Sequence, residues 1–551
     1  MNEIKTSCAS TDRKWSTWES IDWNKCEIAV NKLQARIVKA QKAGKHGRVK
    51  SLQWVLTHSF YAKALAVKRV TSNSGSDTAG IDKVKWSTPN ARFKAIGELK
   101  RRGYKPQPLK RVNIKKSNGK LRPLGIPTMK DRAMQALYLL ALEPVSETTA
   151  DSNSYGFRKE RSTGDAREQC FCVLAKKTSP EWIMEGDIKG CFDHISHEWL
   201  LNNIPMDKVM LRKWLKCGFV FNKELFPTEE GTPQGGIISP TLANMTLDGL
   251  QTMLAEKYHK KFVNRKTTYY PKVHLVRYAD DFIITGRSKE ALEEIKPLVV
   301  DFLKERGLTL SEEKTKITHI DDGFDFLGYN IRKYKGVLLI KPSKKSLKKF
   351  MQKIRGIIDS NKGSKQESLI RLLNPVITGR VNYYKNCVAS DTFRKADYLI
   401  FEKLWQWAKR RHPKKGKYWI ADRYFTRVKN RNWCFVANFK KGKTDDRIAL
   451  KRLYDTKITR YVKVKGEANP FAPEWTEYFE KRKTYKMLQS LNGRKSLLYM
   501  WERQNHLCPV CGKPIDKEHP WGTSQQIVNG KKVNFLLHDS CRRKVIQTNK
   551  M

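Results

Sequence analysis

The 551-residue chain carries 109 lysines and arginines against 55 aspartates and glutamates, which gives a formal net charge of +54. Because a single-sign charge of this size opposes compaction unless a polyanion neutralises it, the expected partner is a large nucleic acid. No stretch approaches the length of an apolar membrane span, and Met1 to Ser16 lack the apolar segment of a signal peptide, so neither membrane binding nor secretion is expected.

Cysteine usage points to a reducing compartment. The chain has 11 cysteines, an odd number, and most of them are scattered singly rather than paired as in a disulfide framework. The expected location is therefore the bacterial cytoplasm, in association with the nucleoid, or the interior of an organelle.

Helices and a turn-rich loop are predicted before the first strands. Apolar periodicity predicts amphipathic helices from Lys25 to about Lys42 and from Val49 to Lys68. The loop from Thr71 to Asp82 is rich in turn residues. Residues 101–127 predict two strands joined at Ser117-Asn118-Gly119, which is a hairpin-turn signal.

Three aspartates sit where buried strands are predicted to end. Asp187 follows the short apolar run Trp182–Met184, and Asp280 and Asp281 fall at a turn between the two apolar halves of residues 273–286. Adjacent carboxylates repel each other and are costly to bury without a cation, for which Mg²⁺ is suited. If the three converge, two metals can activate a 3′-hydroxyl and stabilise a leaving pyrophosphate, which is nucleotidyl transfer. An ordinary acidic hairpin turn is the alternative.

The composition shifts toward basic helices after Lys341. A helix with one apolar and one basic face is expected there, followed by helices at Glu367–Leu373 and Asp391–His412. The run from Lys409 to Lys415 is surrounded by tryptophans, a combination typical of RNA binding. The alternative is that this run of charges is solvated surface without a nucleic-acid partner.

Several ordered segments give the chain a family resemblance from roughly Gln34 to Lys544. They include Glu185-Gly186-Asp187, Pro233-Gln234-Gly235, Tyr278-Ala279-Asp280-Asp281 and the segment Leu373–Tyr384. In this order they resemble group II intron-encoded proteins, which combine a reverse transcriptase with a maturase.

The resemblance implies an α+β right-hand polymerase with fingers, a palm with an antiparallel sheet and a helical thumb, plus a basic DNA-binding region and a small zinc-knuckle module. The implied divisions are an N-terminal helical extension at 1–80, fingers and palm at 81–340, the thumb or maturase domain at 341–438, the DNA-binding region at 439–500 and the zinc module at 501–551.

The resemblance also implies roles for individual side chains. It makes Asp187, Asp280 and Asp281 the catalytic ligands of two Mg²⁺ ions. The implied nucleotide-binding residues are Lys115, Arg122, Phe192 and Gln234. Among them Phe192 would crowd the sugar 2′ position and reject ribonucleotides, unless it is simply a core phenylalanine. The residues expected to contact RNA or DNA are Arg158, Lys159, Lys314, Lys344, Lys348, Lys409, Arg410 and Arg411.

Two cysteine-containing pairs near the C-terminus have metal-ligand spacing. They are Cys508 with Cys511 and His538 with Cys541, and together they predict a closed zinc site; unligated thiols are the alternative. The arrangement resembles an HNH endonuclease domain, but Gln525-Gln526-Ile527 stands where that family has His-His-Ile, and Arg542 replaces a histidine. Neither glutamine nor arginine can act as a general base, so a zinc-stabilised remnant that does not cut DNA is expected.

The expected function has two parts. The protein would bind its group II intron RNA to assist splicing, and would copy that RNA into DNA by target-primed reverse transcription during intron mobility. Its partners would be the intron RNA, target DNA and deoxynucleoside triphosphates, with no membrane and with the oligomeric state left open. The alternatives are a splicing maturase that no longer polymerises and a stand-alone reverse transcriptase of another lineage.

Overall fold

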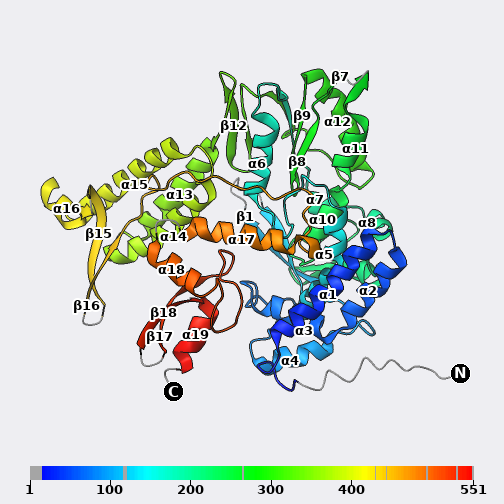
Figure 1. The fold of residues 1–551 in the computed structure, drawn as a ribbon, viewed down its shortest axis with the longest axis horizontal. Coiled ribbons are helices and arrows are strands. Elements are labelled where there is room, and N and C mark those ends of the chain that lie inside the picture. Colours follow the sequence, from blue (N-terminus) through cyan, green and yellow to red (C-terminus); the bar gives the residue numbers. More distant parts are fainter. Residues whose placement is uncertain are drawn as a thin grey trace. The chain divides into compact units, whose positions relative to one another are not determined.

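The computed structural model describes residues 15–115, 119, 121–263, 266–428, 430–441, 444–491, 494–528 and 531–548. The predicted turn residues Ser117 and Asn118 therefore lie outside the described residues. The chain divides into two compact units, one that ends at Glu467 and one formed by Ala468–Met551 (Figure 1). Each unit is described by itself.

The first unit begins with helices gathered around one buried helix, α5 (Met129–Thr149). The surrounding helices are α1 (Trp23–Lys42), α2 (His46–His58), α3 (Phe60–Thr71) and α4 (Pro89–Glu98). Of these, α1, α2 and α3 pack directly on α5, as Figure 1 shows in blue and cyan. The prediction of one helix from Val49 to Lys68 is wrong, because Ser59 is extended (ψ 135°) and separates α2 from α3.

An antiparallel four-stranded sheet carries the predicted aspartates. Its order is β10 (Lys316–His319), β3 (Trp182–Gly186), β9 (Asp281–Gly286) and β8 (His274–Tyr278). The predicted strands on both sides of Asp280 are confirmed, and Tyr278 pairs with Asp281 across the turn. Helix α12 (Lys289–Lys304) packs on β9 and β3, and α6 (Thr163–Leu174) packs on β8.

Two helices occupy the stretch from Thr241 to Glu256, for which the sequence alone predicts a single helix after the Pro233-Gln234-Gly235 segment. They are α10 (Ser239–Leu247) and α11 (Leu250–Lys257). The break falls at Asp248 and Gly249, because Asp248 is extended and Gly249 adopts a left-handed conformation with φ 97°.

A second four-stranded sheet has the order β2 (Leu121–Ile126), β1 (Leu109–Lys115), β4 (Phe219–Phe221) and β5 (Glu224–Phe226), with β1 parallel to β4. The two predicted strands within residues 101–127 are confirmed as β1 and β2. The remaining short elements of this part are α7 (Cys191–His194), α8 (His197–Asn203), α9 (Lys208–Leu215), β6 (Lys261–Val263) and β7 (Lys266–Tyr269).

The rest of the first unit is a three-stranded sheet, a set of helices and a second three-stranded sheet. The first sheet is formed by β11 (Phe324–Phe326), β12 (Tyr329–Tyr334) and β13 (Val337–Pro342). The helices are α13 (Lys344–Ser360), α14 (Gln366–Tyr384), α15 (Ser390–Arg411) and α16 (Lys417–Tyr424). The last sheet is formed by β14 (Phe425–Val428), β15 (Arg431–Lys441) and β16 (Thr444–Ala449). Helix α14 runs past the predicted end at Leu373, through Pro375, because its buried residues continue to Tyr384.

The second unit has its own core around Trp501, which is 2% exposed and donates a hydrogen bond from its indole nitrogen to the Ile515 carbonyl. Its elements are the 3₁₀ helix Pro473–Trp475, α17 (Thr476–Leu491), α18 (Lys495–Arg503), β17 (Trp521–Val528), β18 (Lys531–His538) and α19 (Asp539–Thr548).

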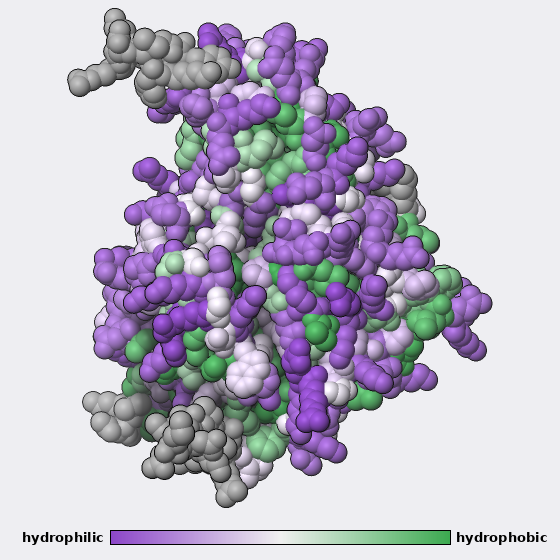
Figure 2. Space-filling model, turned by 90° about the vertical axis from the view of Figure 1, so that its right-hand side faces the viewer, coloured by the Kyte–Doolittle hydropathy of each residue, from purple (hydrophilic) through white to green (hydrophobic). Residues whose placement is uncertain are grey.

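Hydrophilic residues cover most of the face drawn in Figure 2, where apolar residues are scattered between them. Among the described residues, no helix is both long enough and apolar enough to cross a membrane.

Arg158 does not face solvent, which is contrary to the expectation that it faces nucleic-acid phosphates. Its side chain is 5% exposed and forms two hydrogen bonds with the carboxylate of Glu147, at 2.8 and 2.7 Å. The guanidinium also donates to the carbonyls of Asp151 and Ser154. The buried carboxylate of Glu147 on α5 thus forms an ion pair with Arg158. The pair is needed because burying either charge alone would be costly. The neighbouring Lys159 is exposed, so its predicted contact with nucleic acid stays a prediction.

Arg158→Ala is expected to lower the free energy of unfolding by about 3 kcal/mol, because it removes one partner of a buried ion pair. Arg161 still contacts Glu147, which keeps the loss at the lower end of the usual range. Urea denaturation measures the effect, and Lys159→Ala serves as the matched control, with an expected change within about 0.5 kcal/mol. Unchanged stability of Arg158→Ala with weaker RNA binding would restore the original prediction.

Candidate active site and candidate metal cluster

The Asp280-Asp281 turn is held against the segment that precedes α6. Ala279 lies in the left-handed region with φ 58°. A Cβ added to Gly156 would lie 2.4 Å from the backbone nitrogen of Ala279. Only glycine permits this close approach of the two backbones. Arg277 donates its N–H to the Asn153 carbonyl, and the N–H of Tyr155 donates to the Arg277 carbonyl, which fixes the strand that leads into the turn.

The side chain of Arg277 is fully buried directly below the turn. Its guanidinium forms an ion pair with Asp248, and it donates to Asn244 Oδ1 at 3.3 Å and to the Ala279 carbonyl at 3.5 Å. Burial raises the pKa of Asp248 to about 7, although the charge of Arg277 opposes the shift. Sequence reasoning missed this pair, although a charged residue inside an apolar strand requires a buried partner.

Asp187 lies just beyond the end of β3, next to β9, which begins at Asp281. The ammonium of Lys314 lies 2.7 Å from Asp187 Oδ2, and the N–H of Ser311 donates to the Asp187 carbonyl. The hydrogen bond to Asp187 raises the pKa of Lys314. Lys314, predicted to contact nucleic acid, thus contacts a predicted catalytic carboxylate.

The charges of the three carboxylates influence one another. Burial raises the pKa of Asp280, and the negative charge of Asp187 adds to the shift. Partial removal from water, together with the charges of Asp280 and Asp187, raises the pKa of Asp281 to about 6. Concentrated negative charge on oxygen ligands suits a hard divalent cation such as Mg²⁺.

A chain of hydrogen bonds crosses from β2 to the loop before α10. Arg122 Nε donates to Gln234 Oε1 at 2.6 Å, and Gln234 Nε2 lies 3.2 Å from both carboxylate oxygens of Asp193. The Gly125 N–H donates to the Gln234 carbonyl and joins the loop to the strand. The structure therefore brings two predicted nucleotide-binding residues together, and it adds Asp193, which the sequence did not single out.

Phe192 and Lys115 occupy different environments. Phe192 is partly buried, with its ring 6.1 Å from that of Phe157 in an edge-on arrangement, and its carbonyl accepts the Thr232 N–H. Phe192 thus lies at the rim of the core, not in its centre. Lys115 is exposed at the end of β1, where it pairs with Leu121, one position from the pair of Ile114 with Arg122.

The remaining predicted nucleic-acid contacts divide into exposed and engaged side chains. The exposed ones are Lys344 and Lys348 on α13 and Lys409 and Arg410 on α15. Arg411 differs, because it donates to the carbonyls of Lys362 and Ser364 and its guanidinium lies over the ring of Trp407. Arg411 therefore anchors the loop between α13 and α14.

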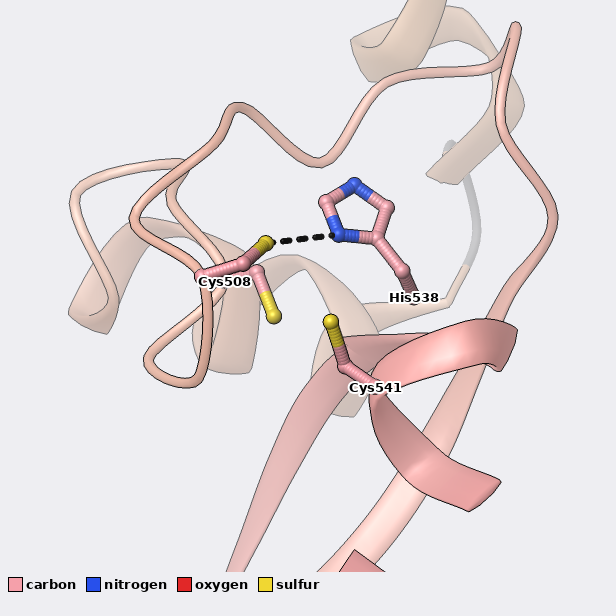
Figure 3. Close-up of side chains that lie close together, drawn as sticks. Cys508, His538 and Cys541 are labelled. Carbon is pink, nitrogen blue, oxygen red and sulfur yellow. Dashed lines mark hydrogen bonds between the residues drawn. The ribbon is translucent and has the colours of Figure 1, made fainter. Parts of the chain in front are cut away.

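A separate metal-ligand cluster forms in the second unit from Cys508, Cys511, His538 and Cys541, whose ligand atoms lie within 4.8 Å of one another (Figure 3). No other His, Cys, Asp or Glu group of three or more meets this condition in the described part of the chain, and the three aspartates are not such a cluster. His538 Nε2 lies 3.1 Å from the Pro514 carbonyl, which can only accept, so Nε2 carries the hydrogen. Nδ1 then remains as a ligand and faces Cys511 Sγ at 3.4 Å.

Local backbone geometry places the first two cysteines. The Gly512 N–H donates to the Cys508 carbonyl, the Cys508 N–H donates to the Lys513 carbonyl, and Gly512 has φ 65°. This tight turn brings Cys508 and Cys511 together, while the junction of β18 and α19 supplies His538 and Cys541. Four soft N and S ligands in one closed set suit Zn²⁺.

Three family models match the chain in order. They are the N-terminal domain of reverse transcriptase at residues 18–99, reverse transcriptase (RNA-dependent DNA polymerase) at 114–331 and the group II intron maturase-specific domain at 347–425.

Curated relatives match at moderate identity. Protein YkfC of Escherichia coli (strain K12) is 34% identical over 305 residues, covering 49% of this chain and 79% of that protein. Group II intron-encoded protein LtrA of Lactococcus lactis subsp. cremoris is 34% identical over 334 residues, covering 49% of this chain and 54% of that protein. The chain thus spans about half of the length of LtrA. A solved telomerase structure from Candida albicans superposes on 57% of this chain and covers 63% of that chain, with 12% identity and a TM-score of 0.32, a likeness too weak to bear on the fold.

We expect the purified chain to carry a stoichiometric zinc ion that Cys541→Ser removes, because a closed site loses most of its affinity with one ligand. Elemental mass spectrometry measures the zinc. Cys172→Ser, which changes an exposed cysteine on α6, is the matched control and should retain the metal. A wild-type protein without zinc, or an unchanged zinc content in Cys541→Ser, would contradict the metal site.

Proposed function

The chain belongs to the group II intron-encoded reverse transcriptases, and we propose that it binds its intron RNA to assist splicing and copies that RNA into DNA by target-primed reverse transcription. The observation that carries the proposal is the arrangement of Asp187 beside the Asp280-Asp281 turn at one end of β3 and β9. The maturase-specific match at 347–425 supports the splicing role.

In the proposed mechanism Asp187, Asp280 and Asp281 would hold two Mg²⁺ ions. Bound there, the ions would supply charge neutralisation for the attacking 3′-hydroxyl and for the leaving pyrophosphate. The raised pKa values of Asp280 and Asp281 support this assignment, because a bound cation would offset both the burial and the mutual repulsion that raise them. Arg277 and Gly156 position the turn and do not touch substrate.

The incoming deoxynucleotide would meet the Arg122–Gln234 pair. The planar guanidinium of Arg122 suits the triphosphate, because it can bind two oxygens at once. Gln234 holds Arg122 through its amide oxygen while its amide nitrogen contacts Asp193, so the two side chains are oriented together. Lys115 on the adjacent strand would add charge, and Phe192, which precedes Asp193 on α7, would restrict the sugar 2′ position.

We further propose a right-hand polymerase division of the chain. Residues 1–80 would be the helical extension, 81–340 the fingers and palm, 341–438 the thumb and maturase domain, 439–500 the DNA-binding region and 501–551 the zinc module. The antiparallel sheet of β10, β3, β9 and β8 supports the palm, and the helices α13, α14 and α15 support the thumb.

RNA binding would rest mainly on exposed basic side chains. Lys344, Lys348, Lys409 and Arg410 are exposed on α13 and α15, and the net charge of +54 supplies the long-range attraction. A splicing maturase that no longer polymerises is disfavoured by the intact set of three aspartates. A stand-alone enzyme of another lineage is disfavoured by the maturase-specific match.

The second unit would touch target DNA without cutting it. Gln525 and Gln526 lie on β17 opposite Asn534 and Val533, and Arg542 on α19 is paired with Asp539 at 3.3 Å. These side chains offer no general base for water, because glutamine is neutral and arginine stays protonated. The primer for DNA synthesis would then come from elsewhere, such as a nascent strand at a replication fork.

Asp280→Asn is expected to lower primer extension on an RNA template by at least about 100-fold, because it removes a carboxylate that neutralises charge in the transition state. Intron binding and splicing assistance should stay near the wild-type level. Gel-resolved primer extension and a splicing assay on the same preparation measure both. Wild-type extension by the variant would refute the site, and loss of both activities would point to misfolding.

Phe192→Ala is expected to raise ribonucleotide incorporation relative to deoxynucleotide incorporation by about 10-fold or more, because it opens space at the 2′ position. The ratio of kcat/KM values for the two sugars measures the discrimination. Phe157→Ala, which removes the neighbouring ring, is the matched control and should change the ratio less. An unchanged ratio in Phe192→Ala would show that Phe192 only packs in the core and does not select the sugar.

A further inference from the structure

A cavity of about 600 Å³ lies between helix α15 and the sheet of β14, β15 and β16. Its β15 wall lies beyond Phe425, the last residue of the maturase-specific match. The volume is within the range of sites that hold small organic ligands. None of the roles proposed above uses this cavity.

Aromatic rings form one wall of the cavity. Phe401, Phe425 and Trp433 line it, and Trp405 lies behind them with its ring 5.9 Å from that of Trp433. Trp433 is 54% exposed although its ring touches the other three. The exposed part of this large indole lies beside an open cavity, where it can stack on a flat ligand.

The backbone at Trp433 is strained, and the strain accompanies a change in the direction of its side chain. Trp433 has φ 61°, in the left-handed region that a bulky side chain rarely adopts. The strands β14 and β15 shift register here, so that Asn432 and Trp433 together oppose Arg427. Such a β-bulge redirects a side chain, and strain of this kind persists where the surrounding structure enforces it.

Positive charge surrounds the cavity. Its lining includes four basic side chains, Arg394, Arg431, Lys451 and Arg452, and two acidic ones, Asp397 and Asp455. Both acids are already engaged. The oxygens of Asp397 accept the N–H groups of Leu453 and Tyr454 at 2.9 Å, and Asp455 is paired with Arg431. Arg394 lies 3.8 Å from Asp391, and Arg452 lies 3.9 Å from Asp397. Among the basic lining residues, Lys451 has no carboxylate among its described contacts, and its ammonium lies 3.1 Å from the hydroxyl of Thr378.

We propose that this cavity binds an unpaired nucleotide of the RNA, with its base stacked on Trp433 and its phosphates held by the basic rim. A flat aromatic wall recognises any base, and a cationic rim suits the phosphates on either side of it. An uncharged apolar ligand would gain nothing from the basic side chains that line the cavity. The inference rests on the proposed role of the chain in binding intron RNA, and it adds a site in which one nucleotide is drawn out of the RNA.

The test compares the full chain with Trp433→Ala, Trp433→Phe and Trp54→Ala. Trp54 is a matched control, because it is 60% exposed and lies outside this cavity. The probes are a 12-nucleotide single-stranded oligoadenylate and a blunt RNA duplex of the same length, titrated at several salt concentrations by fluorescence anisotropy. Thermal unfolding of each variant is measured in parallel, and Trp433→Gly, which suits the left-handed backbone, replaces Trp433→Ala if the latter does not fold.

Trp433→Ala is expected to weaken oligoadenylate binding about 5- to 150-fold, which is the range for losing one base stack on an aromatic ring. The salt dependence should stay unchanged, because no phosphate contact is lost. Duplex binding should change less than twofold, Trp433→Phe should retain most of the affinity, and Trp54→Ala should bind like the wild type.

Equal oligoadenylate affinity in Trp433→Ala and wild type would overturn the proposal, as would an equal loss of duplex binding. Binding of the apolar dye anilinonaphthalene sulfonate that depends on Trp433 but is not displaced by oligoadenylate would assign the cavity to an apolar partner instead. Primer extension by the wild-type protein tests the polymerase function separately. Its failure would refute that function and leave the oligoadenylate result standing.

Discussion

A buried guanidinium beneath the aspartate turn determines the geometry of the candidate active site. Arg277 is 0% exposed, and its charge is balanced by Asp248 at the break between α10 and α11. Removing either partner would leave an uncompensated charge in the interior, a large penalty relative to the usual stability of a domain. The pair therefore holds β8 against α10, and the turn that follows β8 has little freedom to move.

A second buried pair extends this arrangement along the same segment. Arg158 joins residues 151–158 to Glu147 on α5, while Arg277 joins the same segment, through its backbone, to β8. Gly156 lies between the two anchors, where it admits the backbone of Ala279. Residues 151–158 thus connect α5 to the Asp280-Asp281 turn, and Arg158 contributes to this connection through its buried ion pair with Glu147.

How much the sequence predicts depends on how local the determining interactions are. The hairpin around Asp280 and the cysteine knuckle were predictable, because apolar runs and ligand spacing lie within a few residues of each other. The burial of Arg158 was not, since it depends on Glu147 in another element. The breaks at Ser59 and Gly249 were also missed, because helical periodicity continues across them and the departure is set by the packing of distant elements. The Arg122–Gln234 pair joins residues 112 positions apart, and the sequence showed only that each suits a nucleotide.

The two candidate metal sites differ in what their ligands allow. The three aspartates form a local concentration of negative charge in a basic chain, and the ammonium of Lys314 is paired with one of them. Because phosphates are also negative, we expect them to bind beside the aspartates only when a divalent ion lies between the two. The Cys508 cluster has four protein ligands in one closed set, and its histidine is oriented by a backbone carbonyl. Such a closed set would leave a bound ion no open position for water or substrate, so its expected role is to stabilise a small unit whose core also contains Trp501. Catalysis by this protein is therefore expected at the aspartates, where a bound divalent ion would share its coordination between carboxylates and substrate, and not at the cysteines.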